Sequence, residues 1–147
     1  MKSAFKPIAA AIALAAGLAG NAFAERPANL AGTTWTVQTN RDPVQLVIET
    51  QGGPGAPGAA TCRTINGHCN LTPPEIGVRG WYCPSTGRIH LVHRNLNTSD
   101  AVRVFTGNVS DNVIGQPLYM AGTMTVLIAT LADHADLGEY NFSAVKQ

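Results

Sequence analysis

The chain has 147 residues, of which 45% are hydrophobic and 13% charged, and its formal net charge is +1. This length suits one domain with a single core and is too short for two. The balanced charge argues against nucleic acid as a partner, because binding to phosphates needs a concentrated basic face.

The N-terminus has the three parts of a cleaved export signal. Lys2 and Lys6 supply positive charge, residues 7–19 form an uncharged and mostly apolar run, and residues 22–24 read Ala-Phe-Ala. The small residues Ala22 and Ala24 suit signal peptidase. The apolar run is shorter than the ~20 residues that a membrane-spanning helix needs. We therefore expect a signal peptide over 1–24, cleavage before Glu25, a secreted or periplasmic protein, and no membrane anchor after cleavage.

Residues 25–147 are expected to form one all-β domain, because no window shows the helical spacing of apolar residues. Short alternating runs predict eight antiparallel strands at 33–39, 44–51, 61–69, 76–83, 88–94, 101–108, 117–130 and 138–146. The Gly/Pro/Ala-rich stretch 52–60 predicts a loop without regular structure, and Asn66-Gly67 predicts a break in the third strand. Short connections favour an up-and-down eight-stranded β-barrel, with a β-sandwich as the alternative.

Three cysteines, Cys62, Cys69 and Cys83, allow one disulfide and leave one free thiol. Such a bond fits an oxidising compartment. Antiparallel pairing about residues 72–75 sets position 62 opposite 83 and position 69 opposite 76, which favours Cys62–Cys83. Cys62–Cys69 is the alternative, because the Asn66-Gly67 turn lies between them. The lack of a Cys-x₂-Cys pair argues against metal binding by these cysteines.

Two short segments resemble known barrel proteins. Gly32-Thr33-Thr34-Trp35 resembles the Gly-x-Trp opening of lipocalins and avidins with one extra residue, and residues 104–108 resemble the aromatic-Thr-Gly segment of a late avidin strand. The resemblance is to the calycin-type barrels, nearer to avidin than to lipocalin. It implies that the Trp35 ring closes one end of a barrel. Avidins stack biotin between tryptophans, but the stretch 88–94 has none, so biotin binding is not carried over.

No catalytic or metal-binding signature stands out. His90 and His93 are three residues apart on one predicted strand and so point to opposite faces. Ser85, Ser99 and Ser110 lie in expected turns, outside any nucleophile-elbow context. Nearly all carboxylates also fall in loops, where solvated turn residues are usual. We expect no enzyme activity, no metal and no cofactor.

The ligand-binding candidates are the aromatic and basic residues Trp81, His93, Arg103 and Tyr119. A barrel interior that combines them suits a small amphipathic ligand. The alternative for the same residues is a packed interior or an oligomer face. Trp35, Cys62 and Cys83 are expected to be structural. The alternation alone leaves open which strand faces point inward.

The expected function is non-catalytic binding of a small molecule or a protein by an exported barrel, through its mouth or its outer face. The first alternative is inhibition of a secreted or periplasmic enzyme, by analogy of fold with small disulfide-bearing barrels that inhibit bacterial proteases. Residues 25–30 and the loop 52–60 are then the segments that enter the enzyme cleft. The second alternative is a structural or assembly role, in which barrels contact one another in a homo-oligomer.

Processing of the N-terminus is directly testable. We expect N-terminal sequencing of the exported protein to begin at Glu25, since Ala22 and Ala24 fit the peptidase and a charged segment follows. Protein extracted from membranes that still begins at Met1 would contradict this expectation.

Overall fold

The computed structural model describes residues 25–39, 43–56, 59–70, 76–95, 97–128 and 137–147, so the predicted signal peptide lies outside the described residues. The strands are β1 (Thr33–Gln38), β2 (Val44–Ala56), β3 (Ala59–Asn70), β4 (Ile76–Cys83), β5 (Arg88–Asn95), β6 (Ala101–Val109), β7 (Tyr119–Val126) and β8 (Gly138–Lys146). No helix in this part of the chain is long and apolar enough to cross a membrane.

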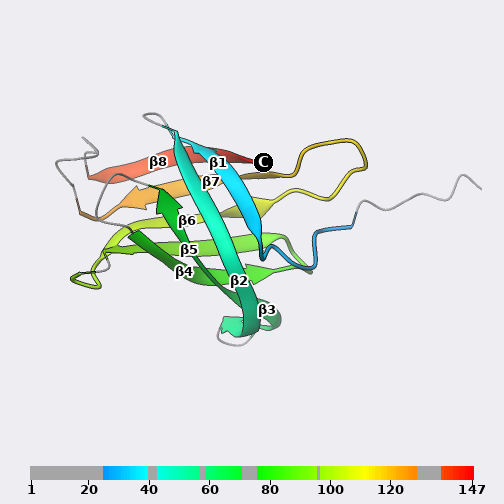
Figure 1. Ribbon diagram of the computed structural model, residues 1–147, viewed down its shortest axis with the longest axis horizontal. Coiled ribbons are helices and arrows are strands. Elements are labelled where there is room, and N and C mark those ends of the chain that lie inside the picture. The colour runs from blue at the N-terminus through cyan, green and yellow to red at the C-terminus, as the bar shows by residue number, and fades with distance from the viewer. Residues whose placement is uncertain (1–24, 40–42, 57–58, 71–75, 96, 129–136) are drawn as a thin grey trace, which may run out of the picture.

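Consecutive strands pair antiparallel, and β8 pairs back with β1, so the sheet closes into a barrel. Figure 1 shows β4 to β8 side by side, with β2 crossing steeply in front of them. The predicted eight-stranded barrel is confirmed, and the β-sandwich is excluded because all eight strands belong to one continuous ladder.

The predicted loop at 52–60 is wrong over 52–56 and 59–60, while residues 57–58 lie outside the described residues. β2 continues to Ala56 and β3 begins at Ala59, although the pairing slips between Ile48 and Thr50 and again on either side of Pro54. Such bulges leave single residues out of the ladder while the strands stay paired. Regular pairing would not accommodate this Gly/Pro-rich segment. The bulges therefore keep it within the β2–β3 hairpin.

The predicted break at Asn66-Gly67 is also wrong. Gly67 pairs with Ile48 on β2 and Val78 on β4, inside an uninterrupted β3. A Cβ atom at this position would overlap the carbonyl oxygen of Val47. The glycine thus marks a close approach of two strands rather than a turn.

Alternation along β4 and β5 shows which faces point inward. Val78 and Tyr82 on β4, and Ile89, Leu91 and His93 on β5, are all buried. The six remaining strands supply the rest of the core, which includes Trp35, Val37, Leu46, Ile48, Ile65, Cys69, Phe105, Met120, Met124, Phe142 and Ala144. These buried residues show which strand faces point into the barrel, which the sequence left open.

The segment before β1 caps one end of the barrel. Leu30 is fully buried, and its backbone N–H donates a hydrogen bond to the side chain of Gln51 (2.9 Å). The same Gln51 side chain donates to the carbonyl of Ala28 (2.9 Å). The Tyr82 hydroxyl donates to the carbonyl of Pro27 (2.8 Å). In Figure 1 this segment, in blue, lies at the same end as the β6–β7 connection. These bonds fix the segment against its own barrel.

Trp35 lies beneath this cap and is completely buried. Its indole N–H donates to the Thr33 hydroxyl (2.8 Å), which in turn donates to the carbonyl of Leu30 (2.5 Å). A buried indole nitrogen needs such a partner, because an unsatisfied donor in the core is costly. The expected structural role of Trp35 at one barrel end is consistent with this burial.

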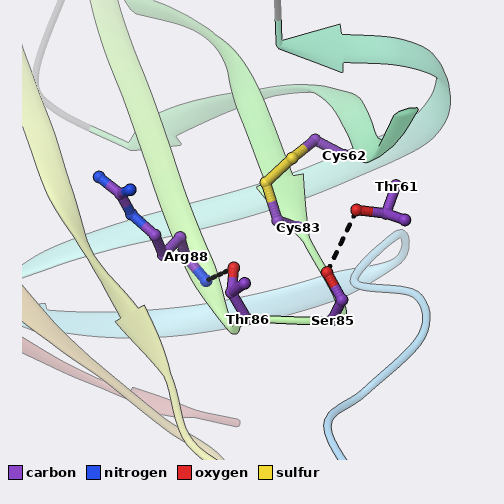
Figure 2. The surroundings of a disulfide bond; sticks show 6 residues. All are labelled: Thr61, Cys62, Cys83, Ser85, Thr86 and Arg88. Atoms are coloured by element: carbon purple, nitrogen blue, oxygen red, sulfur yellow. Dashed lines mark hydrogen bonds between the residues drawn. A yellow bond between two sulfur atoms is a disulfide. The ribbon is translucent and has the colours of Figure 1, made fainter. Parts of the chain in front are cut away.

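Cys62 and Cys83 form the disulfide, and Cys69 is a buried free cysteine. Cys69 pairs with Ile76, which is the register that favoured this disulfide. The bond joins β3 to β4 beside a contact between the hydroxyls of Thr61 and Ser85, 3.2 Å apart (Figure 2). A disulfide between two buried cysteines is compatible with an oxidising compartment.

Truncation of the two tryptophans should separate core from surface. Trp35→Ala removes a buried ring and should cost ~3–5 kcal/mol of unfolding free energy, whereas Trp81→Ala should cost less, because Trp81 is on the outer face. Urea unfolding of both variants measures the difference. Small and equal losses would mean that the Trp35 ring is not a core element.

The free thiol should be inert in the folded protein. Burial raises the pKa of Cys69 to about 12, and the nearby Arg103 charge opposes this only in part. A thiol that is both buried and protonated does not react as a nucleophile. We expect no labelling by a thiol reagent at pH 8, and one equivalent in urea with the disulfide intact. Rapid labelling of the native protein would contradict the burial.

Candidate functional site

The structure separates the four predicted ligand-binding residues. His93 and Arg103 are neighbours across β5 and β6 and are buried inside the barrel, at 0% and 6% exposure. Tyr119 is 47% exposed on the outer face. Trp81 also faces outward, because it precedes the fully buried Tyr82 and successive strand residues point to opposite faces. The predicted interior with all four residues does not exist.

Among the residues that the structure describes, the barrel interior is closely packed. The enclosed cavity among its apolar side chains measures about 10 Å³, which is at most the room for one water. His93 packs edge-on against Phe105 (5.9 Å between ring centroids), and Phe105 packs edge-on against Phe142 (5.3 Å). The predicted alternative of a packed interior is therefore correct for His93 and Arg103.

A groove of about 1040 Å³ instead lies on the outer face of the barrel, over β3, β4 and β5. Most of its lining belongs to these strands, with one residue from β2 and one from the turn after β5. The residues that give it chemical character are Glu49, Asn66, Arg79, Trp81, His90, Val92, Arg94 and Asn95.

Strand register arranges the groove in cross-strand rows. Trp81 stands opposite His90, and the two rings stack with centroids 5.6 Å apart and planes 19° from parallel. In the next row Arg79 lies between Asn66 on β3 and Val92 on β5. The groove therefore has a flat aromatic platform beside an arginine.

The third row has a gap in its middle. Gly77 lies between His68 on β3 and Arg94 on β5, and it has no side chain to fill the outer face. A glycine inside a strand often marks such a low point. The row thus forms a depression flanked by a basic residue.

Arg94 is held at the groove edge by the turn that follows β5. Its guanidinium donates to the carbonyl of Ser99 (2.9 Å), a residue with φ 62°. The turn is fixed by the Ser99 N–H bond to the Asn95 carbonyl (2.7 Å) and by the Asn95 side chain, which accepts from the N–H of Asn97 (2.8 Å). One contact uses only part of the guanidinium, which has five donors.

The acidic residue of the groove has a basic neighbour. The Glu49 carboxylate lies 2.9 Å from Nδ1 of His68 across β2 and β3. With two arginines, Arg79 and Arg94, against this one carboxylate, the charged side chains of the lining are positive in sum. A positive groove lined by one aromatic stack attracts an anion with a flat face.

His90 is neutral at neutral pH. Its Nδ1 lies 3.1 Å from the Thr106 hydroxyl, and desolvation by burial lowers its pKa below 6.5. A neutral imidazole stacked on Trp81 covers one face of the indole and adds no charge.

The segments proposed for enzyme inhibition are engaged in the fold. The backbone N–H of Asn112 donates to the carbonyl of Glu25 (3.0 Å), and Arg26 forms an ion pair with Asp111 (3.2 Å). Residues 52–60 lie largely within the β2–β3 hairpin. A second, smaller cleft of about 430 Å³ is lined by the N-terminal cap, the β6–β7 connection and the end of β8.

Within the described ranges, no three His, Cys, Asp or Glu side chains gather closely enough to hold a metal ion. The groove residues that sequence reasoning missed are Arg79, His90 and Arg94. Their signal was present, because Arg79 shares a face with Trp81, and His90 shares one with Arg94. That signal becomes useful only once the outward face is known.

The chain matches no protein-family model, and no curated protein resembles it closely enough to count as a match.

The Trp81–His90 stack provides a pH readout. A protonated imidazole quenches a stacked indole, so tryptophan fluorescence should fall on acidification with a midpoint below 6.5, the direction set by burial of His90. Between that midpoint and 6.5 the unfolded chain binds more protons at this site than the folded one, so stability should decline as pH falls.

His90→Gln is the control for this titration, because the three other histidines remain. The fluorescence transition should disappear in that variant. A transition of unchanged midpoint and amplitude would assign it to another group.

Proposed function

We propose that the protein is an exported, non-catalytic binding protein whose ligand lies in the outer groove over β3, β4 and β5. The observation that carries this proposal is the juxtaposition of the Trp81–His90 stack with Arg79 and Arg94 around the gap at Gly77. The packed interior, with about 10 Å³ of free space, favours the outer face over the barrel mouth.

The lining favours recognition rather than chemistry. Arginine forks bind carboxylates and similar anions in a fixed geometry, and an aromatic stack holds a flat, weakly polar surface. Catalysis requires a nucleophile or a general acid–base pair held against the ligand. Here Glu49 lies against His68, and Nδ1 of His90 lies against Thr106.

Export and the calycin-type relationship belong to the same proposal. Residues 1–24 have the composition of a signal peptide, and the Cys62–Cys83 disulfide suits a secreted or periplasmic location. The buried Trp35 at the start of β1, under an N-terminal cap, supports the resemblance to calycin-type barrels.

Native mass spectrometry of protein purified from its exported form tests the proposal. We expect a bound ligand in the wild-type protein, and its loss in Trp81→Ala, because that change removes half of the aromatic platform. Tyr119→Ala is the matched control, since it removes an exposed aromatic from β7 outside the groove lining.

A ligand that both variants retain would place binding elsewhere and overturn the proposal. A co-purified enzyme in place of a ligand would support the inhibitor alternative, and an oligomer without ligand would support the assembly alternative.

A further inference from the structure

We infer that the ligand of the outer groove is a linear polysaccharide that carries carboxylates, such as a chain of uronic acid units. This inference rests on the proposed function and names the ligand class of the same site. It follows from four features of the groove, which are its size, its aromatic platform, the spacing of its arginines and the absence of a free strand edge.

The open extent of the groove favours a chain. Pockets for single small molecules measure roughly 300–1,000 Å³ and bury most of the ligand. This groove has about 1040 Å³, and it lies open along the outer face from Glu49 on β2 to the turn residue Ser99. An open channel of this kind contacts several units of a polymer from one side.

The aromatic platform suits a sugar ring. The Trp81 and His90 rings stack nearly parallel, and each keeps one ring face that its partner does not cover, a flat apolar surface. A pyranose packs its C–H face against such a surface, and its hydroxyls need hydrogen-bond partners at the rim. Asn66 and Asn95, which also line the groove, provide amide groups of the right kind.

The two arginines favour a ligand with more than one negative charge. Arg79 is paired with Val92, and Arg94 follows Val92 by two residues on the same strand. Arg79 and Arg94 are therefore diagonal neighbours on adjacent strands, and the backbones of such neighbours lie about 7–8 Å apart. Two arginines whose backbone positions are that far apart suit an anion that repeats along a chain, as the carboxylates of a polyuronate do.

The closed barrel argues against an acidic peptide as the ligand. Extended peptides gain much of their affinity by adding a strand to an exposed sheet edge. Here β3, β4 and β5 each have paired neighbours on both sides, so no edge is available at the groove. Nucleic acid is also disfavoured, because two arginines do not form the basic stripe that phosphate backbones need.

The test is isothermal titration of the full exported protein with four defined probes: hexagalacturonate, the neutral cellohexaose, a hexaglutamate peptide and an oligothymidylate. We expect binding of hexagalacturonate alone, and weaker binding as salt increases. Arg79→Gln and Arg94→Gln should each reduce affinity about tenfold or more, as expected for a lost charge-assisted hydrogen bond. Trp81→Ala should cause a similar loss.

Two further variants sharpen this experiment. Arg88→Gln removes an exposed arginine from the same strand but outside the groove lining, and should leave affinity unchanged. Gly77→Val fills the gap in the outer face and should block binding while both arginines and the aromatic stack remain.

Equal affinity for cellohexaose would overturn the need for carboxylates, and preference for the peptide or the oligonucleotide would overturn the polysaccharide. If no probe binds but a native ligand is lost in Trp81→Ala, this inference fails and the proposed function stands. If Trp81→Ala has no effect on any ligand, both fail.

Discussion

The pairing of β1 with β8 is the constraint on which the rest of this structure depends. Trp35 to Gln38 pair with Ser143 to Lys146, and this one ladder converts an eight-stranded meander into a closed barrel. Closure gives every strand two neighbours and forces alternate side chains inward. With eight strands, the enclosed space is just wide enough for those side chains to fill. In this barrel side chains from all eight strands fill the described interior, and the proposed ligand site lies on the outside.

Closure of the sheet also creates the two ends of the barrel. A ring of strands leaves two open ends, and here the chain before β1 closes one of them with Leu30 above Trp35. Gln51 binds this segment through both ends of its amide group, which matches one backbone donor and one backbone acceptor. An N-terminal segment bound in this way contributes to the fold.

Much of the fold could be predicted because its signals are local. Alternating residues and turn dipeptides mark the strands, and the spacing of the three cysteines favours the same β3–β4 register that the barrel adopts. The prediction for residues 52–60 is wrong because bulges keep a Gly/Pro-rich segment paired, and bulges leave no local signature. The same limit applies to Gly67, whose role depends on the approach of β2.

The site was harder to predict, because neither face of β4 or β5 is purely apolar. His93 and Arg103 are inside, while Val92 lines the outer groove, so polarity misleads at each of these positions. The predicted set therefore mixed two inward residues with the outward Trp81 and Tyr119. Glu49 on β2 also lines the groove, because β2 pairs with β3 along its edge.

The place of the proposed binding site, on the outer face of a closed barrel, has an energetic consequence. Backbone hydrogen bonds on both sides of β4 and β5 hold Arg79, Trp81 and His90 at fixed spacings before any ligand arrives. The turn carbonyl of Ser99 restrains Arg94 in the same way. Association normally costs free energy to order side chains and loops, and pre-ordered groups reduce that cost. Under the proposed function, stability and recognition are thus divided between the two faces of the same strands: Tyr82 and Leu91 lie in the core, while Trp81 and Arg94 line the outer groove.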